Sequence, residues 1–379
     1  MKKNLLSMFL CVTMAAALLT GCGSKQEETP AAAAAEEVVE EEKEATEEEA
    51  AEEATEEAAE TEEETTEEVA EETAAEEETP AEEAAEEAAE EEAEEEENYE
   101  TGDASLDNPR NQDEIGEKEL LVVSFGTSFN DNRRLTIGAI EDALEEAISD
   151  FSVRRGFTAQ IIIDHVQRRD GEVIDNVTEA LDRAVNNEVK TLVVQPTHLM
   201  DGLEYNDLEA ELAGYADAFE QIVLGKPLLT SDDDFARVAE AVVEATAEFD
   251  DGETAIVFMG HGTEAESNAI YEKMQGVLAD AGHEHYYVGT VEAAPTLEDV
   301  MAKVGEGEYK KVVLRPLMVV AGDHANNDMA DPEDPESWYS QFTAAGYEVT
   351  TVLEGLGQLP AIRQIYVEHA QEAISSLDA

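Results

Sequence analysis

From residue 119 to the C-terminus, short apolar runs alternate with longer segments whose apolar residues recur every three to four positions. The short runs predict strands, and the longer segments predict amphipathic helices. Because the short runs are apolar at nearly every position, they indicate strands buried on both faces. The predicted strands are 120–124, 160–164, 191–195, 221–224, 255–259, 286–288, 311–315 and 348–352. The predicted helices are near 132–149, 173–186, 206–219, 231–248, 264–281, 296–304, 338–345 and 360–375.

This alternation predicts an α/β fold with parallel sheets flanked by helices. The two halves also repeat each other, since QPTHLMDG at 195–202 matches RPLMVVAG at 315–322 in the spacing of its proline and glycine. The turn at 125–127 likewise matches that at 260–263. We therefore expect two similar lobes, residues 119–230 and 231–379, with a cleft between them. The halves differ where His261 aligns with Phe125 and His324 aligns with Glu204.

A different pattern occupies residues 1–22, where Met1-Lys2-Lys3 precedes an apolar run and the tetrapeptide Leu-Thr-Gly-Cys ends at Cys22. A positive start, a short apolar core and small residues at the end predict a secretory signal. The apolar run is short for a transmembrane helix. The last four residues resemble the bacterial lipobox, in which the cysteine receives a diacylglyceryl group; a plain signal peptide with an incidental Cys22 is the alternative. Cys11 would leave with the signal, so no thiol would remain for a disulfide or a metal.

Residues 23–100 form an acidic segment rich in Glu and Ala. From Lys25 to Glu100 the chain carries 38 Glu and two Lys, half of the whole-chain net charge of −72. Such a segment has too little apolar surface to offset the entropy lost on ordering, so we interpret it as a disordered, extended spacer. A role in gathering divalent cations is the alternative. Residues 101–118 are interpreted as a boundary segment before the first lobe.

The remaining residues, 101–379, are also acidic, with 18 Lys and Arg against 56 Asp and Glu. Nucleic acid is therefore excluded as a partner, because its phosphates require a basic face. Anionic lipid is excluded as a docking surface for the same reason. We expect the lipid on Cys22 to hold an exported protein on the outer face of the bacterial cytoplasmic membrane or in the periplasm.

Three polar side chains each follow a predicted strand: His261, Glu292 and His324. Ligands of open α/β sheets bind outside the carboxyl ends of the strands, so these three are expected to face one cleft. Neutral imidazoles suit borderline divalent ions such as cobalt, nickel or zinc, and a carboxylate nearby accepts protons. His198 follows another strand and is a candidate substrate-binding residue, together with the turn residues Phe125, Gly126 and Thr127. Candidates for orienting His324 through hydrogen bonds are Asp323, Asn326 and Asp328.

Each of the three has an alternative interpretation. Residues 260–263 resemble part of a phosphate-binding turn at a helix N-terminus, although they match no full nucleotide motif. Glu292 alone is typical of a solvated loop acid, and His324 of a surface residue in a polar loop. The other histidines are expected at capping, turn or surface positions, and they are His165, His283, His285 and His369.

The motifs at 124–128, 195–198, 259–263, 289–292 and 315–324 together resemble the anaerobic sirohydrochlorin cobaltochelatases. These are class II chelatases that need no nucleotide and have two similar α/β lobes, and the resemblance spans about 119–375. It implies insertion of Co2+, or of Fe2+ or Ni2+, into sirohydrochlorin or a related tetrapyrrole in corrinoid (cobalamin) metabolism, with release of two protons. It also implies that His261, Glu292 and His324 bind the metal and handle these protons. The lipoprotein signal and the spacer depart from a family that is usually cytoplasmic.

A second functional hypothesis uses the same residues without turnover. In it, an exported protein captures a tetrapyrrole or a metal ion for uptake; buffering of metal beside the acidic spacer is a weaker variant. Glu292 favours an enzyme, because a carrier needs no proton acceptor. The sequence leaves the metal, the macrocycle and homo-oligomerisation open.

Replacing Cys22 with Ala removes the residue expected to carry the lipid. We expect the Cys22→Ala protein to move from the membrane fraction to the soluble fraction of a bacterial host. The matched control, Cys11→Ala, lies in the part that would be removed and should leave the protein in the membrane fraction. Fractionation followed by immunoblotting checks this, and a Cys22→Ala protein that stays with the membrane contradicts lipidation.

Overall fold

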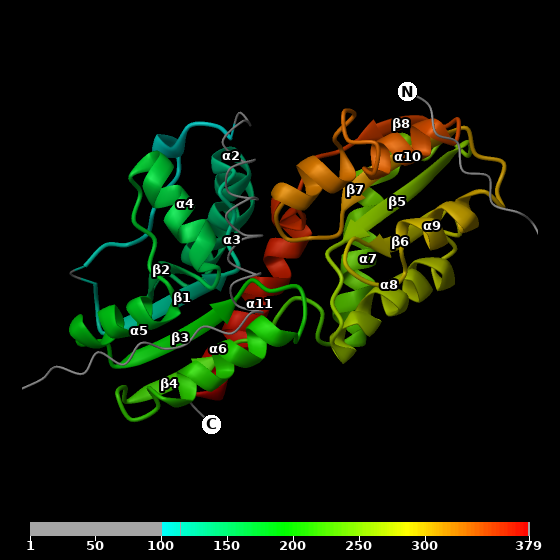
Figure 1. Cartoon of the computed structure of the whole chain (residues 1–379). Coiled ribbons are helices and arrows are strands. Elements are labelled where there is room, and N and C mark those ends of the chain that lie inside the picture. The colour runs from blue at the N-terminus through cyan, green and yellow to red at the C-terminus, as the bar shows by residue number, and fades with distance from the viewer. Residues whose placement is uncertain (1–100, 114, 378–379) are drawn as a thin grey trace, which may run out of the picture. The chain divides into compact units, whose positions relative to one another are not determined.

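The computed structural model describes residues 101–113 and 115–377, so the predictions for the signal, Cys22 and the spacer lie outside the described residues. Two four-stranded parallel sheets form the fold, with strand orders β2-β1-β3-β4 and β6-β5-β7-β8 (Figure 1). The predicted α/β class with two similar lobes is thus confirmed. The strands are β1 (Lys118–Ser124), β2 (Ser152–Phe157), β3 (Thr191–Pro196), β4 (Gln221–Leu224), β5 (Thr254–Gly260), β6 (Tyr286–Thr290), β7 (Lys311–Pro316) and β8 (Glu348–Thr351).

Helices connect the strands in both halves. They are α2 (Asn130–Arg133), α3 (Ala139–Ala147), α4 (Gln160–Asp170), α5 (Val177–Asn186), α6 (Leu203–Ala213), α7 (Asp232–Thr246), α8 (Ala269–Asp280), α9 (Leu297–Val304), α10 (Trp338–Ala344) and α11 (Pro360–Ser376). Two π-helical turns, η3 (Arg134–Gly138) and η6 (Ala325–Met329), interrupt this pattern. Capping boxes begin α5, α7 and α9. Within the described residues, every helix is too short or too polar to cross a membrane.

The central strands bury both faces, and neighbouring residues enter different cores. In β1, Leu120 and Val122 pack in a cluster that includes side chains of α3, α7 and α11, whereas Leu121 and Val123 pack with α5 and α6. The second sheet repeats this division, since alternate residues of β5 pack with α8 on one face and with α9 and α10 on the other. The near-continuous apolar runs of the sequence follow from this two-sided burial.

One hydrophobic cluster contains side chains from both sheets, so the two halves share a core. The last helix, α11, contributes to it by packing against α3 and β3 of the first half as well as α7 (Figure 1). Its Tyr366 hydroxyl donates a hydrogen bond of 2.7 Å to the carbonyl oxygen of Thr197. Residues 360–376, expected in the second lobe, therefore also contact elements of the first.

One predicted strand is wrong. Residues 160–164 begin α4, and the second strand is β2, eight residues earlier. Three consecutive isoleucines suggested a strand, yet only Ile163 of the three is fully buried. The true strand contains Arg154 and Arg155, two charged residues that interrupt its apolar pattern. Both are buried in ion pairs, which allows them to lie inside a strand.

These arginines belong to a buried network that also holds residues 101–113 against the first half. Arg155 makes a two-pronged contact with Glu141, both distances being 2.8 Å, and a second contact of 2.7 Å with Asp107. Asp107 also accepts a hydrogen bond of 2.8 Å from Arg133. Arg110 contacts Glu141 from the same segment. The stretch predicted as a boundary therefore supplies buried partners to the fold.

Burial alone would raise the pKa of Asp107. The hydrogen bonds and charge of Arg155, followed by those of Arg133, outweigh burial and hold this pKa below its ordinary value. A carboxyl group with a lowered pKa stabilises the fold above its unfolded-state pKa. This contribution is lost as the pH falls through the folded-state pKa.

Arg155→Met should lower the free energy of unfolding by about 3–5 kcal/mol, because it leaves two buried carboxylates without their main cation. The matched control is Lys118→Met, which breaks the exposed pair between Lys118 and Asp150 and should cost about 1 kcal/mol or less. Denaturant titration of both variants measures the difference. Equal losses would show that the buried network contributes no more than a surface ion pair.

Candidate metal site

The turn that carries His261 is shaped by two glycines. A Cβ atom on Gly260 would lie 2.1 Å from the Tyr271 ring, and one on Gly262 would lie 2.9 Å from the backbone nitrogen of Ala293. Gly262 also has φ +92°, in the region that favours glycine. Helix α8 begins only at Ala269, so the turn does not lie at a helix N-terminus, as the phosphate-binding interpretation requires. The glycines instead permit close packing that fixes the backbone of His261.

Glu292 is tied to the same turn through its backbone. The carbonyl oxygen of His261 accepts hydrogen bonds from the N–H groups of Val291 and Glu292, at 3.1 and 2.8 Å. The side chain of Glu292 is exposed. His261 and Glu292, which follow β5 and β6, thus lie in two loops whose backbones are hydrogen-bonded to each other.

His324 comes from a helical turn beyond β7 that leads into η6, rather than from the strand end itself. Its ring lies beside that of His261, with 4.7 Å between ring centroids and an angle of 78° between ring planes. The predicted convergence of these two histidines is therefore present in the structure. They are 63 residues apart in the sequence, and the pairing of β5 with β7 brings their loops to one edge of the sheet.

Both rings are oriented through Nδ1. The Nδ1 atom of His261 lies 2.7 Å from the carbonyl oxygen of Gly262, and that of His324 lies 2.7 Å from Oδ2 of Asp328. Since both partners are acceptors, each neutral ring carries its proton on Nδ1 and has the lone pair on Nε2. The expectation that Asp328 orients His324 is met by this contact.

Contacts from the first half hold the loop that precedes His324. The N–H of Ala321 donates a hydrogen bond of 2.8 Å to Oδ1 of Asn132, and a Cβ on Gly322 would lie 3.1 Å from Oγ1 of Thr127. Thr127 is itself buried, and its hydroxyl accepts a hydrogen bond from the N–H of Phe129. Thr127 therefore lies at the contact between the halves.

The other turn residues predicted to bind substrate differ in exposure. Phe125 is 50 % exposed, an unusual state for a large aromatic side chain. Gly126 has φ +111°, and a Cβ there would lie 2.7 Å from the Phe157 ring. Backbone conformation and local packing thus explain why residue 126 is glycine. The Phe125 side chain, by contrast, stays half exposed to solvent.

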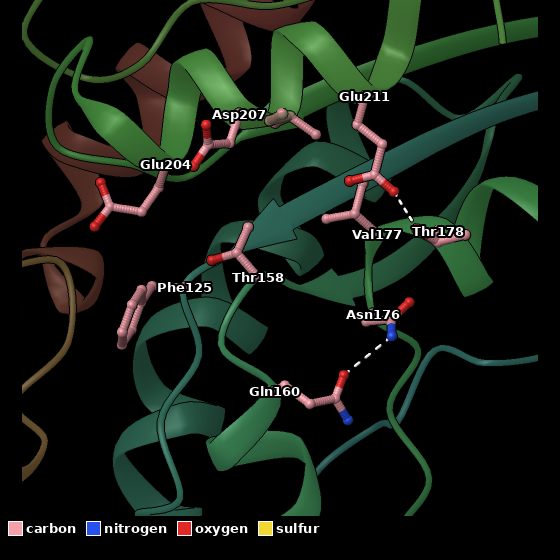
Figure 2. A pocket seen from close by; sticks show the side chains of 10 residues that line it. Phe125, Thr158, Gln160, Asn176, Val177, Thr178, Glu204, Asp207 and Glu211 are labelled. Atoms are coloured by element: carbon pink, nitrogen blue, oxygen red, sulfur yellow. Dashed lines mark hydrogen bonds between the residues drawn. The ribbon is translucent and has the colours of Figure 1, made fainter. Parts of the chain in front are cut away.

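Phe125 lines a cavity of about 320 Å³ in the first half, between the strand ends and α6 (Figure 2). Glu204, Asp207 and Glu211 line it from one face of α6, with Thr158 and Gln160 on other walls. Glu204 and Phe125 lie at one end of the view, and at the other end the Thr178 hydroxyl donates a hydrogen bond to Glu211. These three carboxylates give the cavity one acidic wall.

His198 follows β3, as predicted, and its ring nitrogens are buried. Neither nitrogen has a hydrogen-bond partner among the described residues. Burial lowers the pKa of His198 to about 4, although the charge of Glu204 acts weakly in the opposite direction. The ring is therefore neutral near pH 7.

Two histidines predicted at peripheral positions are buried. The Nε2 atom of His369, in α11, lies 3.3 Å from Oδ1 of Asp234 at the start of α7. His165, in α4, is also buried. The periodicity of the last helix already places His369 near Tyr366 and Ala370, which are buried residues. His285 pairs with Asp250, 3.2 Å away, at the opposite end of β6 from Glu292.

Among the described residues, one group of three side chains has ligand atoms within 4.8 Å of one another: Asp323, His324 and Asp328. All three are partly buried. The sequence predicts that both aspartates orient His324, and it does not predict that they bind metal. Their grouping arises from the π-helical turn, which has no clear sequence signal.

Two parallel-sheet lobes with paired imidazoles at the strand ends define a class of α/β protein suited to handling a divalent metal. Residues 118–375 match the protein family described as cobalt chelatase (CbiK), and the chain belongs to this family. It is 36% identical over 258 residues to a sirohydrochlorin cobaltochelatase of Salmonella typhimurium, covering 68% of this chain and 97% of that protein. It is 31% identical over 278 residues to the sirohydrochlorin cobaltochelatase CbiKC of Nitratidesulfovibrio vulgaris, covering 72% and 97%.

The similarity to solved structures is more distant. SirB from Bacillus subtilis with Fe3+ aligns with a TM-score of 0.49 and 13% identity, covering 68% of this chain and 96% of that chain. CbiX, described as the terminal enzyme for siroheme biosynthesis in denitrifying bacteria, aligns with a TM-score of 0.43 and 16% identity, covering 68% and 99%.

The lowered pKa of His198 predicts a pH-dependent stability. Between pH 7 and pH 5, the His198 ring takes up a proton in the unfolded state but not in the folded state. This residue alone should therefore lower the free energy of unfolding by about 2 kcal/mol over that interval. His198→Gln should show a smaller fall over the same interval. Denaturant titrations at both pH values give the difference, and identical pH dependence in the two proteins would argue against a neutral buried ring.

Proposed function

We propose that this chain inserts Co2+ into sirohydrochlorin, releasing two protons and using no nucleotide. Its membership of the cobalt chelatase family supports the reaction. The observation that supports the site is the juxtaposition of His261 and His324, with ring centroids 4.7 Å apart and Glu292 anchored to the His261 backbone. Fe2+ and Ni2+ are alternative metals with the same preference for imidazole.

In this proposal His261 and His324 hold the incoming ion through Nε2, because their Nδ1 atoms are engaged with Gly262 and Asp328. Imidazole binds borderline divalent ions less tenaciously than thiolate, so the ion can pass to the four nitrogens of the macrocycle. Glu292, exposed beside His261, accepts protons that leave the pyrrole nitrogens. Phe125 offers an apolar face to the macrocycle, and His198 contributes a neutral ring after β3.

We propose that no separate carrier function is needed to explain these residues. A carrier would use the two imidazoles and would have no use for a proton acceptor at Glu292. The two curated relatives also carry the name of an enzyme. Binding without turnover is therefore the less economical interpretation.

We further propose that the chain is exported and held to the outer face of a bacterial membrane through lipid on Cys22. The support is the tripartite pattern of residues 1–22. The acidic segment that follows would then act as a tether.

His261→Ala and His324→Ala should each lower the rate of metallation about 100-fold or more, because each removes a ligand of the ion. Anaerobic incubation with sirohydrochlorin and Co2+, followed by absorption spectroscopy, measures this rate. His283→Ala is the matched control, since His283 precedes the opposite end of β6. Near-wild-type rates in both site variants would overturn the assignment of the ligands.

A further inference from the structure

The loop that follows β7 rests on the first half of the chain through three consecutive residues. Val320 packs against a hydrophobic cluster whose buried members all belong to the first half. The N–H of Ala321 donates a hydrogen bond of 2.8 Å to Oδ1 of Asn132. Gly322 comes next, and a Cβ there would lie 3.1 Å from Oγ1 of Thr127. The first half therefore positions this loop, although the ligands of the proposed metal site all belong to the second half.

Among these three contacts, the hydrogen bond to Asn132 constrains direction as well as distance. Ala321 is buried, and a buried N–H without an acceptor is unfavourable. The loop must therefore keep this bond, or move until another acceptor replaces Asn132. Asn132 and Ala321 are 189 residues apart in the sequence. The bond thus fixes where the loop lies on the first half, and it is not part of a local turn.

Asn132 itself is held on a fixed backbone. Its carbonyl oxygen accepts a hydrogen bond of 2.6 Å from the hydroxyl of Thr136. The next residue, Arg133, is fully buried and forms ion pairs of 2.8 Å with both Asp107 and Glu172. The buried arginine network of the first half thereby anchors α2, the helix from which the Asn132 side chain reaches the loop.

The two imidazoles of the proposed site are held by different means. The backbone of His261 is hydrogen-bonded to the loop of Glu292, within the second half. His324 lies only three residues after Ala321, so a displacement of Ala321 reaches His324 and leaves His261 in place. The ring centroids of the two histidines are 4.7 Å apart. A misplacement of about 1 Å between reacting groups can lower a rate about 100-fold.

We propose that Asn132 is a positioning residue for His324, because its bond to the N–H of Ala321 sets the spacing of the two imidazoles. The inference rests on the proposed function, and it adds a residue of the first half that acts through the loop and not as a metal ligand. The position requires a hydrogen-bond acceptor. An aspartate at residue 132 should therefore serve, whereas an apolar side chain should not.

Asn132→Ala should lower kcat for metallation of sirohydrochlorin by Co2+ about 10- to 100-fold, because it releases the loop. Asn132→Asp keeps an oxygen acceptor and should retain most of the wild-type rate. Asn132→Leu is closer to Asn in volume and gives the same comparison if the alanine variant is unstable. Absorption spectroscopy of the full-length chain under anaerobic conditions measures these rates.

The matched control is Asn111→Ala. Asn111 also lies in the first half, and its side-chain amide donates a hydrogen bond of 2.8 Å to the carbonyl oxygen of Val173. Removing it deletes a bond of the same kind away from the loop, so this variant should metallate at the wild-type rate. Denaturant titration of every variant establishes that the proteins compared are folded.

A double-mutant cycle separates positioning of His324 from general support of the fold. If Asn132 acts through His324, adding Asn132→Ala to His324→Ala should lower the rate less than about twofold further. Bound Co2+ also shifts the ring protons of ligating histidines in the NMR spectrum. In Asn132→Ala the shifted signals of His324 should move or weaken, whereas those of His261 should persist. A residue that only stabilises the fold would give additive losses and leave both sets of signals unchanged.

Wild-type rates in both Asn132→Ala and Asn132→Leu would overturn the inference. Additive losses in the cycle would do the same, as would an Asn132→Asp protein as slow as Asn132→Ala. Failure of the proposed function is a different result, namely wild-type protein that leaves sirohydrochlorin unmetallated. Titration with Co2+ alone, in excess Mg2+ to occupy other carboxylates, then still tests the positioning role. In that titration Asn132→Ala should weaken Co2+ binding about 10- to 100-fold, and only when His324 is present.

Discussion

The arrangement of the site depends on one backbone contact between two turns. The carbonyl oxygen of His261 accepts two N–H groups from the loop that carries Glu292, and this requires the approach that Gly262 permits. Any side chain at residue 262 would collide with that loop at 2.9 Å. The ends of β5 and β6 are therefore locked at the point where the imidazole and the carboxylate leave the backbone. Local rigidity of this kind lets two exposed side chains keep a fixed spacing.

A second constraint comes from the charge of the chain. The described residues are strongly acidic, yet several of the largest fully buried side chains are arginines, including Arg110, Arg133 and Arg155. Each forms an ion pair with a carboxylate, so these positive charges are buried inside the first half and do not contribute to its surface. The exposed surface consequently favours cations over anions.

The sequence predicts most of this fold because parallel strands buried on both faces leave continuous apolar runs. Seven of the eight strands overlap the predicted ranges, and the exception, β2, contains Arg154 and Arg155. Its buried charges are stabilised by partners distant in sequence, such as Asp107, and a local pattern cannot show these. The same limit applies to α11, whose two-sided burial depends on the first half. For the site, His261, Glu292 and His324 could be named from their positions after strands. The grouping of Asp323 with Asp328 could not, because it depends on a π-helical turn.

The internal repeat shows how one architecture yields two different surfaces. Phe125 and Glu204 of the first half are the counterparts of His261 and His324 in the second. In the first half this pair lines one cavity, with an open aromatic face and carboxylates of α6 (Figure 2). In the second half the counterparts are two imidazoles in contact. Equivalent positions after equivalent strands thus keep their proximity while their chemistry differs. The segments that follow the strands supply this proximity in both halves, and the residue types at these positions are aromatic and acidic in the first half and imidazole in the second.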